Sequence, residues 1–329
     1  MAALEPASAP KLRKHLETHS PFRAVRIVSL LPSATEILYA IGLGEEVVGV
    51  SPECDYPPAA KSKTVVSRNV IDPQTMSQGA IDAAVLAHLR EGGGLYHVDV
   101  EKLQTLAPDL MFTQNLCNVC AASMEDVKGA ASRLSKRPDI VSLDPTDLDE
   151  VLHSIERVGQ ETGRESEAGA LVDGLRTRLR AVTERTRDIT DRPAVACIEW
   201  FDPLFNAGHW VPQMVEVAGG EELLADRGKP SRRIGWEDVV RAAPDVIVLM
   251  PCGFGVDRAV KDARLVARLP GWQDLPAVRS GRVFAVDGSS YFNRPGPRLV
   301  EGVELLAHLL HPERFPREWP KHAVQRVVV

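Results

Sequence analysis

The sequence predicts an α/β protein in which two similar α/β lobes are joined by a long rigid helix. The main observation is a repeat, because Val100–Phe112 aligns without a gap with Trp236–Val248, 136 positions later. Each copy predicts a short helix, an Ala-Pro-Asp stop and an apolar strand. Between the copies, residues 148–187 contain no proline and are rich in Glu, Arg, Leu and Ala, which favours helix. The 329 residues suffice for two lobes that each bury a core.

Composition and pattern divide the chain into five predicted segments. They are a flexible leader at 1–23, an N-terminal α/β lobe at 24–147, a helical linker at 148–190, a C-terminal α/β lobe at 191–312 and a short tail at 313–329. The linker is expected to form two helical segments, of which the second runs from about 165 to 187. A long helix between two lobes acts as a stiff strut.

Apolar and β-branched runs in each lobe predict buried strands. Outside the repeat, these strands are expected at 24–31, 47–50, 140–143 and 194–198. The spacing of Ser33 and Glu36 predicts a capping box before the first helix, and residues 299–310 predict the last helix. Residues 65–98 show no regular period, and Gly92–Gly94 within them are expected to form a mobile loop.

Composition argues against several classes of protein. The net charge is −6 and no basic stripe is present, so a nucleic-acid partner is not expected. No apolar run reaches the ~18–20 residues that a membrane-spanning helix requires. Residues 1–24 contain no apolar block of the kind that a secretory signal has, and the protein is therefore expected to be cytoplasmic.

The cysteines suggest a site for a soft metal. Four of them follow predicted strands, where ligands bind in open α/β sheets, namely Cys54, Cys117, Cys120 and Cys252. Their thiolates could hold a metal ion or contact a metal-bearing ligand. Alternatively, free cysteine packs as a small hydrophobe, as expected for Cys197 inside a strand. The sequence leaves both interpretations open.

Aromatic and polar side chains also follow the predicted strands. The aromatic candidates for stacking on a large flat ligand are Trp200, Phe201, Phe205, Tyr291 and Phe292. The polar candidates are Tyr56 and Arg294, since a guanidinium binds carboxylates, amides and phosphates. Each aromatic ring could instead cover the surface of its own lobe.

Motifs of common catalytic sites are missing from the sequence. It contains no phosphate-binding loop, no Gly-x-Ser-x-Gly elbow and no His-Glu-x-x-His pair. We therefore expect a non-catalytic protein with no catalytic residues and no required cofactor.

Over about residues 25–312, the chain resembles the cobalamin-type substrate-binding proteins of ABC importers. The resemblance is carried by Arg26–Glu36, by Val48–Ser51 with Asp55–Pro58, and by the paired Ala-Pro-Asp strands. It is closer to a cysteine-bearing subgroup of cobalamin-binding proteins, through Leu95–Asp99, Gln114–Ala121, Met250–Phe254 and Tyr291–Arg298.

The resemblance implies two lobes bridged by a long helix, a corrinoid held between them, and one glutamate on each lobe that docks onto an ABC permease. These glutamates correspond to Glu101 and Glu237, which occupy equivalent positions of the repeat. Acidic residues in a first helical turn also favour the helix dipole, which is the structural alternative.

We therefore expect a non-catalytic protein that binds a corrinoid such as cobalamin. Two alternatives stay open. The first keeps the fold but binds haem, an iron chelate or a soft metal ion. The second is a cytosolic chaperone or enzyme that uses Cys117 and Cys120 to handle a metal or cofactor.

Overall fold

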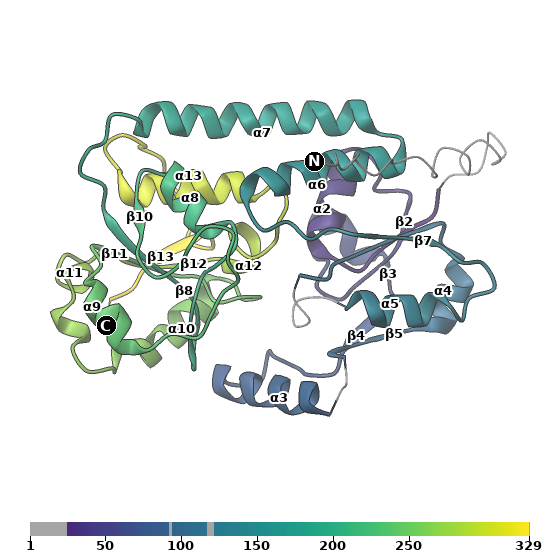
Figure 1. Cartoon of the computed structure of the whole chain (residues 1–329), viewed down its shortest axis with the longest axis horizontal. Coiled ribbons are helices and arrows are strands. Elements are labelled where there is room, and N and C mark those ends of the chain that lie inside the picture. The colour runs from purple at the N-terminus through teal and green to yellow at the C-terminus, as the bar shows by residue number, and fades with distance from the viewer. Residues whose placement is uncertain (1–24, 92–93, 117–121, 329) are drawn as a thin grey trace, which may run out of the picture.

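Two α/β lobes lie side by side, and one long helix runs across both of them (Figure 1). The computed structural model describes residues 25–91, 94–116 and 122–328. None of the helices in these ranges is long and apolar enough to cross a membrane. The two-lobed α/β architecture predicted from the sequence is confirmed.

The N-terminal lobe is built on a parallel sheet with the strand order β3-β2-β1-β6-β7. Its strands are β1 (Ile27–Ser29), β2 (Val47–Val50), β3 (Thr64–Val65), β6 (Leu110–Thr113) and β7 (Asp139–Ser142). A separate antiparallel pair is formed by β4 (Ser67–Asn69) and β5 (Tyr96–Val98). Its helices are α2 (Pro32–Ala40), the 3₁₀ helix η1 (Pro58–Ser62), α3 (Gln78–Arg90), α4 (Val100–Leu106) and α5 (Met124–Ala131). The central strands β1 and β6 are buried along their whole length, which explains their continuous apolar sequence.

The C-terminal lobe repeats this plan with the strand order β10-β8-β11-β12-β13. Its strands are β8 (Ala194–Phe201), β9 (Leu204–Asn206), β10 (Glu221–Glu222), β11 (Val246–Leu249), β12 (Val283–Val286) and β13 (Val324–Arg326). Its helices are α8 (Val211–Val217), α9 (Trp236–Ala242), α10 (Val256–Ala267), η2 (Trp272–Asp274), α11 (Pro276–Arg279), α12 (Gly288–Tyr291) and α13 (Leu299–Leu310). Strand β13 belongs to the segment predicted as a tail, and it pairs antiparallel with β12 at the edge of the sheet.

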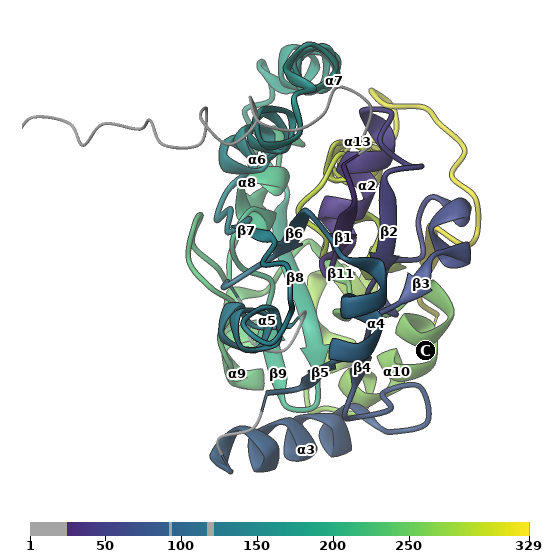
Figure 2. The ribbon, with the colours of Figure 1, turned by 90° about the vertical axis from the view of Figure 1, so that its right-hand side faces the viewer.

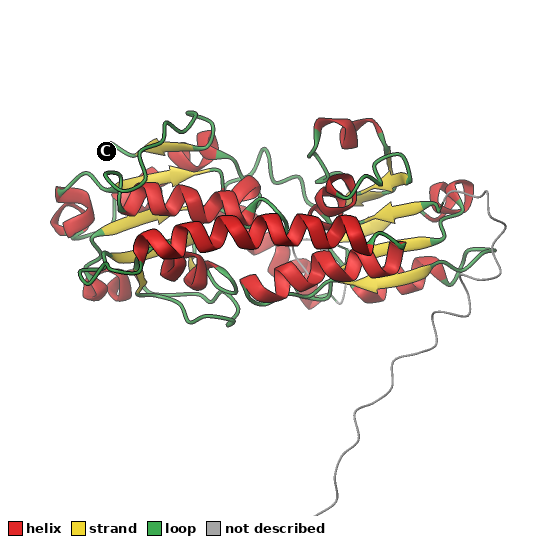
Figure 3. Ribbon diagram, turned by 90° about the horizontal axis from the view of Figure 1, so that it is seen from above, coloured by secondary structure: helices red, strands yellow, loops and turns green. Residues whose placement is uncertain are grey.

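The linker forms the two predicted helical segments, α6 (Leu148–Thr162) and α7 (Glu165–Thr186). Gly163 separates them with a φ of 69°, a left-handed conformation that glycine adopts without strain. Helix α7 then contributes Val172 to the core of the N-terminal lobe and Val182 to the core of the C-terminal lobe (Figure 3). Because one helix is packed into both cores, it forms a rigid strut.

The repeat has the same structure in both lobes. Helix α4 is followed by strand β6, and helix α9 is followed by strand β11. The alanine before each Pro-Asp ends its helix in the left-handed conformation, with a φ of 43° at Ala107 and 44° at Ala243. A left-handed residue and a following proline both stop a helix.

The aspartate of each Ala-Pro-Asp stop holds the backbone where the neighbouring strand begins. The Asp109 carboxylate accepts a hydrogen bond from the backbone N–H of Arg26 at 2.8 Å, and Asp245 accepts one from Ala194 at 2.9 Å. The repeated sequence therefore encodes a repeated tertiary contact.

Two local predictions are wrong. The Ser33 to Glu36 spacing does not form a capping box, because α2 begins after Leu31 without a side-chain cap and Glu36 pairs with arginines instead. The region 65–98, predicted as irregular, contains the helix α3 together with β4 and β5. Residues 92–93 of the predicted glycine loop lie outside the described residues.

Candidate functional site

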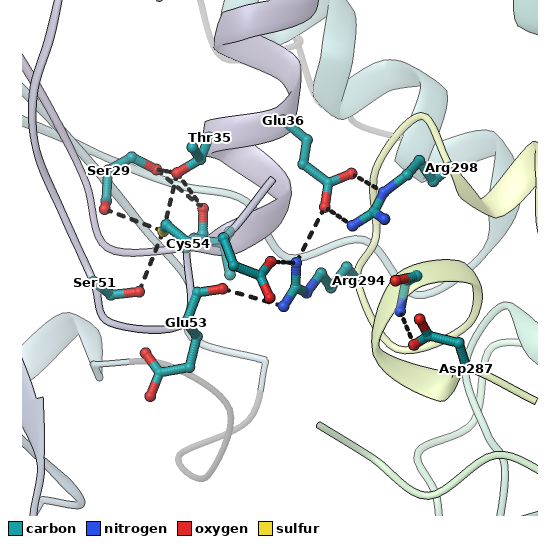
Figure 4. Close-up of polar contacts among 12 residues, drawn as sticks. Ser29, Thr35, Glu36, Ser51, Glu53, Cys54, Asp287, Arg294 and Arg298 are labelled. Carbon is teal, nitrogen blue, oxygen red and sulfur yellow. Dashed lines mark hydrogen bonds and ion pairs between the residues drawn. The ribbon is translucent and has the colours of Figure 1, made fainter. Parts of the chain in front are cut away.

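Loops of the two lobes meet in a buried ion cluster made of Glu36, Asp55, Arg294 and Arg298 (Figure 4). Glu36 on α2 is only 4% exposed, and it accepts hydrogen bonds from Arg298 Nη2 at 2.5 Å and Nε at 2.9 Å. Arg294 Nη1 lies 2.5 Å from Asp55 Oδ1 and 3.4 Å from Glu36 Oε1. Such bidentate, buried pairs fix the relative position of the elements that carry them.

Three of these four charges lie next to element ends, and Glu36 lies in the middle of α2. Asp55 follows β2, whereas Arg294 follows α12 and Arg298 stands at the start of α13. Burial opposes the charge on Arg294, but the carboxylates of Asp55 and Glu36 outweigh it and raise the pKa of the guanidinium. Burial also opposes the charge on Asp55, and the hydrogen bond from Arg294 nevertheless lowers the pKa of that carboxyl. Arg294 and Asp55 therefore stabilise each other's charged forms.

Tyr56 lies at the rim of the cluster. Its ring is covered by the Arg298 guanidinium at 4.0 Å from the ring centroid, and the residue is 44% exposed. A cation over one face leaves the other face of the ring open to a ligand.

Glu53 lies beside the cluster and carries a third carboxylate, which is not part of the ion pairs with Arg294 and Arg298. Its backbone carbonyl accepts a hydrogen bond from Arg294 Nη2 at 3.1 Å, while its carboxylate points away from Arg294 (Figure 4). Burial raises the pKa of Glu53, and hydrogen bonds from Ser51 and Tyr96 partly offset that effect. This carboxylate is available to accept hydrogen bonds from a ligand.

On the C-terminal lobe, Trp200 and Phe254 form a tilted aromatic pair with ring centroids 6.0 Å apart. Trp200 Nε1 donates to the carbonyl of Asp202 at 3.0 Å, which fixes the indole. The Arg258 guanidinium lies 4.4 Å from the centre of the Phe254 ring. Phe254 lies two residues after Cys252 and was not among the predicted aromatic candidates, and it is only 5% exposed.

The four other predicted aromatic residues, Phe201, Phe205, Tyr291 and Phe292, are placed differently. Phe201 is 3% exposed in a core of the C-terminal lobe, and Phe292 is 1% exposed in another. Tyr291 packs its ring edge against Trp319 at 6.2 Å. Phe205 is half-buried on β9, with the Arg233 guanidinium 5.7 Å from its ring centre. We therefore expect Trp200, rather than Phe201 or Phe292, to face a ligand.

Cys54 lies inside the N-terminal lobe rather than at a ligand face. It is 3% exposed, and its Sγ lies 3.0 Å from Thr35 Oγ1 and 3.3 Å from Ser51 Oγ. Burial raises the pKa of the Cys54 thiol, which disfavours the thiolate that metals and electrophiles require. This placement matches the alternative in which the cysteine packs as a small hydrophobe.

Of the other three predicted metal ligands, the structure describes only Cys252. Cys252 is half-buried after β11, and Cys117 and Cys120 lie outside the described residues. Within the described ranges, no group of three or more His, Cys, Asp and Glu side chains is arranged to hold a metal ion.

Glu101 and Glu237 are exposed in the first turns of α4 and α9, one on each lobe. Their equivalent placement follows from the repeat. It leaves both carboxylates accessible to a partner.

The sequence interpretation missed the roles of Glu36 and Arg298 in joining the lobes. One signal was available, because Glu36 is the sole charged residue of the otherwise apolar helix α2. A buried carboxylate needs a partner, so a lone charge on a buried helix predicts a distant arginine.

Comparisons with known proteins agree with this architecture. The family model described as periplasmic binding protein matches residues 27–289. An uncharacterized ABC transporter substrate-binding lipoprotein of Bacillus subtilis is 31% identical over 301 residues, which are 88% of this chain and 81% of the relative. The vitamin B12-binding protein of Vibrio cholerae is 28% identical over 292 residues, which are 86% of this chain and 88% of the relative. The periplasmic heme-binding protein of Roseiflexus superposes with a TM-score of 0.66 at 24% identity, covering 89% of this chain and all of the other.

The expectation of a cytoplasmic protein is wrong. The matching family is that of periplasmic binding proteins and the Bacillus subtilis relative is a lipoprotein, which points to a location outside the cytoplasm. The family match covers most of the described chain. The chain therefore belongs to the periplasmic binding protein family, and it is a substrate-binding protein of the kind that serves ABC transporters.

Proposed function

We propose that this protein binds a corrinoid of the cobalamin type between its two lobes and does not convert it chemically. The observation that carries the proposal is the charge balance between the lobes. The related protein from Vibrio cholerae, whose name assigns it vitamin B12, supports the same ligand class.

Each arginine that joins the lobes is already neutralised by a carboxylate of the chain. Arg294 and Arg298 pair with Glu36 and Asp55, as described above. Arg233 pairs across the lobes with Asp82 at 3.1 Å. Arg258, whose Nη2 donates to the Met76 carbonyl of the other lobe, pairs with Asp262 of its own helix at 2.5 Å. These arginines therefore offer no spare positive charge to a ligand.

This balance favours a ligand whose rim is rich in amides over one whose rim carries carboxylates. A corrin ring is bordered by carboxamides, which are neutral and donate hydrogen bonds. Haem carries two propionates, which need cationic partners when they are buried. Glu53, as a hydrogen-bond acceptor, suits an amide N–H and repels a propionate.

Aromatic surfaces on both lobes suit a flat macrocycle. Trp200 supplies a ring from the C-terminal lobe, with the buried Phe254 packed beside it, and Tyr56 supplies one from the N-terminal lobe. Burying such rings against a ligand contributes both apolar area and favourable ring contacts.

Titration of the purified protein with aquocobalamin and, separately, with haemin tests the proposal. The variant Trp200→Ala should bind aquocobalamin about 10- to 100-fold more weakly, because it loses the stacking surface. The matched control is Trp236→Ala, whose indole stacks on Trp272 at 6.0 Å in another part of the lobe and should not affect affinity.

Two results would contradict the proposal. One is haemin binding tighter than aquocobalamin binding. The other is stoichiometric zinc or iron in protein purified without ligand, lost in Cys117→Ser and Cys120→Ser, which would favour the metal or chaperone alternatives.

A further inference from the structure

Helix α3 belongs to the N-terminal lobe by sequence, but its first residues are anchored in the C-terminal lobe. Gln78 is fully buried, and its Oε1 accepts a hydrogen bond from the backbone N–H of Phe201 at 2.6 Å. Its Nε2 donates to Asp262 Oδ2 at 3.1 Å. One side chain therefore contacts both β8 and α10 of the other lobe.

Arg258 extends this anchor. Its Nε lies 2.5 Å from Asp262 Oδ2, and its Nη2 donates to the carbonyl of Met76 at 2.6 Å. One turn further along α3, Asp82 pairs with Arg233 at 3.1 Å. Met76–Arg90, the α3 strap, is thus attached to the opposite lobe by a set of polar contacts at its N-terminal end.

The outer part of the α3 strap is held less firmly. Val85 is partly buried against a core of the N-terminal lobe, whereas Leu86 and Leu89 are 39% and 38% exposed. The strap contains no apolar side chain that is inserted into a core of the C-terminal lobe.

The lobes are bridged at two opposite edges of the molecule. The strut α7 crosses at one edge and the α3 strap lies at the other (Figures 1 and 2). Separating the lobes at the strut would expose apolar side chains of two cores, whereas releasing the strap breaks a few hydrogen bonds that water can replace. The strap is therefore the bridge that opens at the lower free-energy cost.

The anchor also lies beside Trp200, whose ring is proposed to stack on the ligand. Gln78 holds the residue next to Trp200, and Arg258 covers the ring of Phe254. We propose that the α3 strap is a latch that releases the C-terminal lobe to admit the ligand and then closes beside it. This inference rests on the proposed binding site between the lobes.

A disulfide across the latch tests this inference. An ideal Cβ built on Gly79 lies 3.1 Å from Cγ of Asp202, so cysteines in Gly79→Cys with Asp202→Cys are close enough to form a disulfide. The oxidised double variant should bind aquocobalamin at least about 10-fold more slowly than the same protein after reduction. Wild-type protein taken through the same oxidation controls for the native cysteines. An unchanged association rate, with the cross-link verified by mass spectrometry, would overturn the latch.

A second variant tests the latch without any ligand. Gln78→Ala removes the two hydrogen bonds that the Gln78 side chain makes with the other lobe and leaves the Arg258–Asp262 pair intact. Amide hydrogen exchange within residues 78–90 should become about 10-fold faster, and exchange in β8 and β11 should stay as in the wild type. The control is Gln74→Ala, at an exposed glutamine of the preceding turn.

The two experiments separate the two claims. If wild-type protein binds no corrinoid, the proposed function fails, and the exchange measurement alone then decides the latch. Unchanged exchange in Gln78→Ala would overturn the latch even if the corrinoid binds.

Discussion

Glu36 is the residue on which the contact between the lobes depends most. It is a buried carboxylate held by Arg298 and approached by Arg294, so its removal leaves two guanidiniums with too little compensation. We predict that Glu36→Ala lowers the free energy of unfolding by about 3 kcal/mol, measured by urea denaturation.

The exposed Glu45 of the same lobe provides the control. Glu45→Ala should change the free energy of unfolding by less than about 0.5 kcal/mol. If Glu36→Ala behaved like this control, the cluster would contribute nothing to the stability of the fold.

Residue patterns predicted the strand that carries two of the candidate site residues, but not which of the two side chains is buried, for a physical reason. The strand predicted at 194–198 continues as β8 to Phe201. Since successive side chains of a strand point to opposite faces, Trp200 and Phe201 cannot both face the other lobe. Phe201 turns into the core, and this choice depends on the strand's neighbours rather than on its own sequence.

At the scale of elements, the repeat predicts that equivalent substitutions in the two lobes have similar effects on stability. Asp109 accepts a hydrogen bond from the N–H of Arg26, just before β1, and Asp245 accepts one from the N–H of Ala194, at the start of β8. Asp109→Ala and Asp245→Ala should each lower the free energy of unfolding by about 1–2 kcal/mol, and the double variant should show the sum because the sites are far apart. A large effect in one lobe and none in the other would contradict the structural equivalence of the two copies.

Glu222 on the edge strand β10 gives the fold a pH dependence. It accepts hydrogen bonds from the N–H groups of Cys197 and Leu224, and burial raises its pKa from 4.5 to about 8. The folded protein therefore retains a proton that the unfolded chain releases above pH 4.5. The stability that this carboxyl contributes is fully present below pH 4.5 and is lost as pH rises to about 8.

The variant Glu222→Gln should remove this dependence. Between pH 5 and pH 8, the free energy of unfolding of the wild type should fall by about 2–4 kcal/mol relative to the variant. Glu221→Gln changes the exposed neighbouring residue, and its free energy of unfolding should depend on pH in the same way as that of the wild type. If the free energies of unfolding of the wild type and of Glu222→Gln changed with pH in parallel, the Glu222 carboxyl would not be desolvated.

Most helices and strands were predictable because their burial follows a simple period. The last helix has the predicted bounds Leu299–Leu310, and nine of its residues are buried. Helix α3 was missed because only Gln78 and Ile81 of its residues are buried. Its position depends on polar contacts with the other lobe, which no local pattern reveals.

For the whole molecule, the strut and the repeat determine how a transporter could recognise the protein. We propose that Glu101 and Glu237 dock onto cationic residues of an ABC permease, since they are exposed at equivalent positions of both lobes. Reversing both charges, in Glu101→Arg with Glu237→Arg, should abolish ligand-dependent stimulation of the transporter and leave the affinity for aquocobalamin unchanged. Full stimulation by the double variant would refute this docking site.

The central claim is that the charge balance between the lobes selects an amide-rimmed macrocycle. The most direct measurement is equilibrium dialysis of the purified protein against equal concentrations of aquocobalamin and haemin. The account predicts one retained corrinoid per chain with a Kd of about 1 μM or lower, and at least about 10-fold less haemin. Retention of haemin with loss of the corrinoid would contradict it.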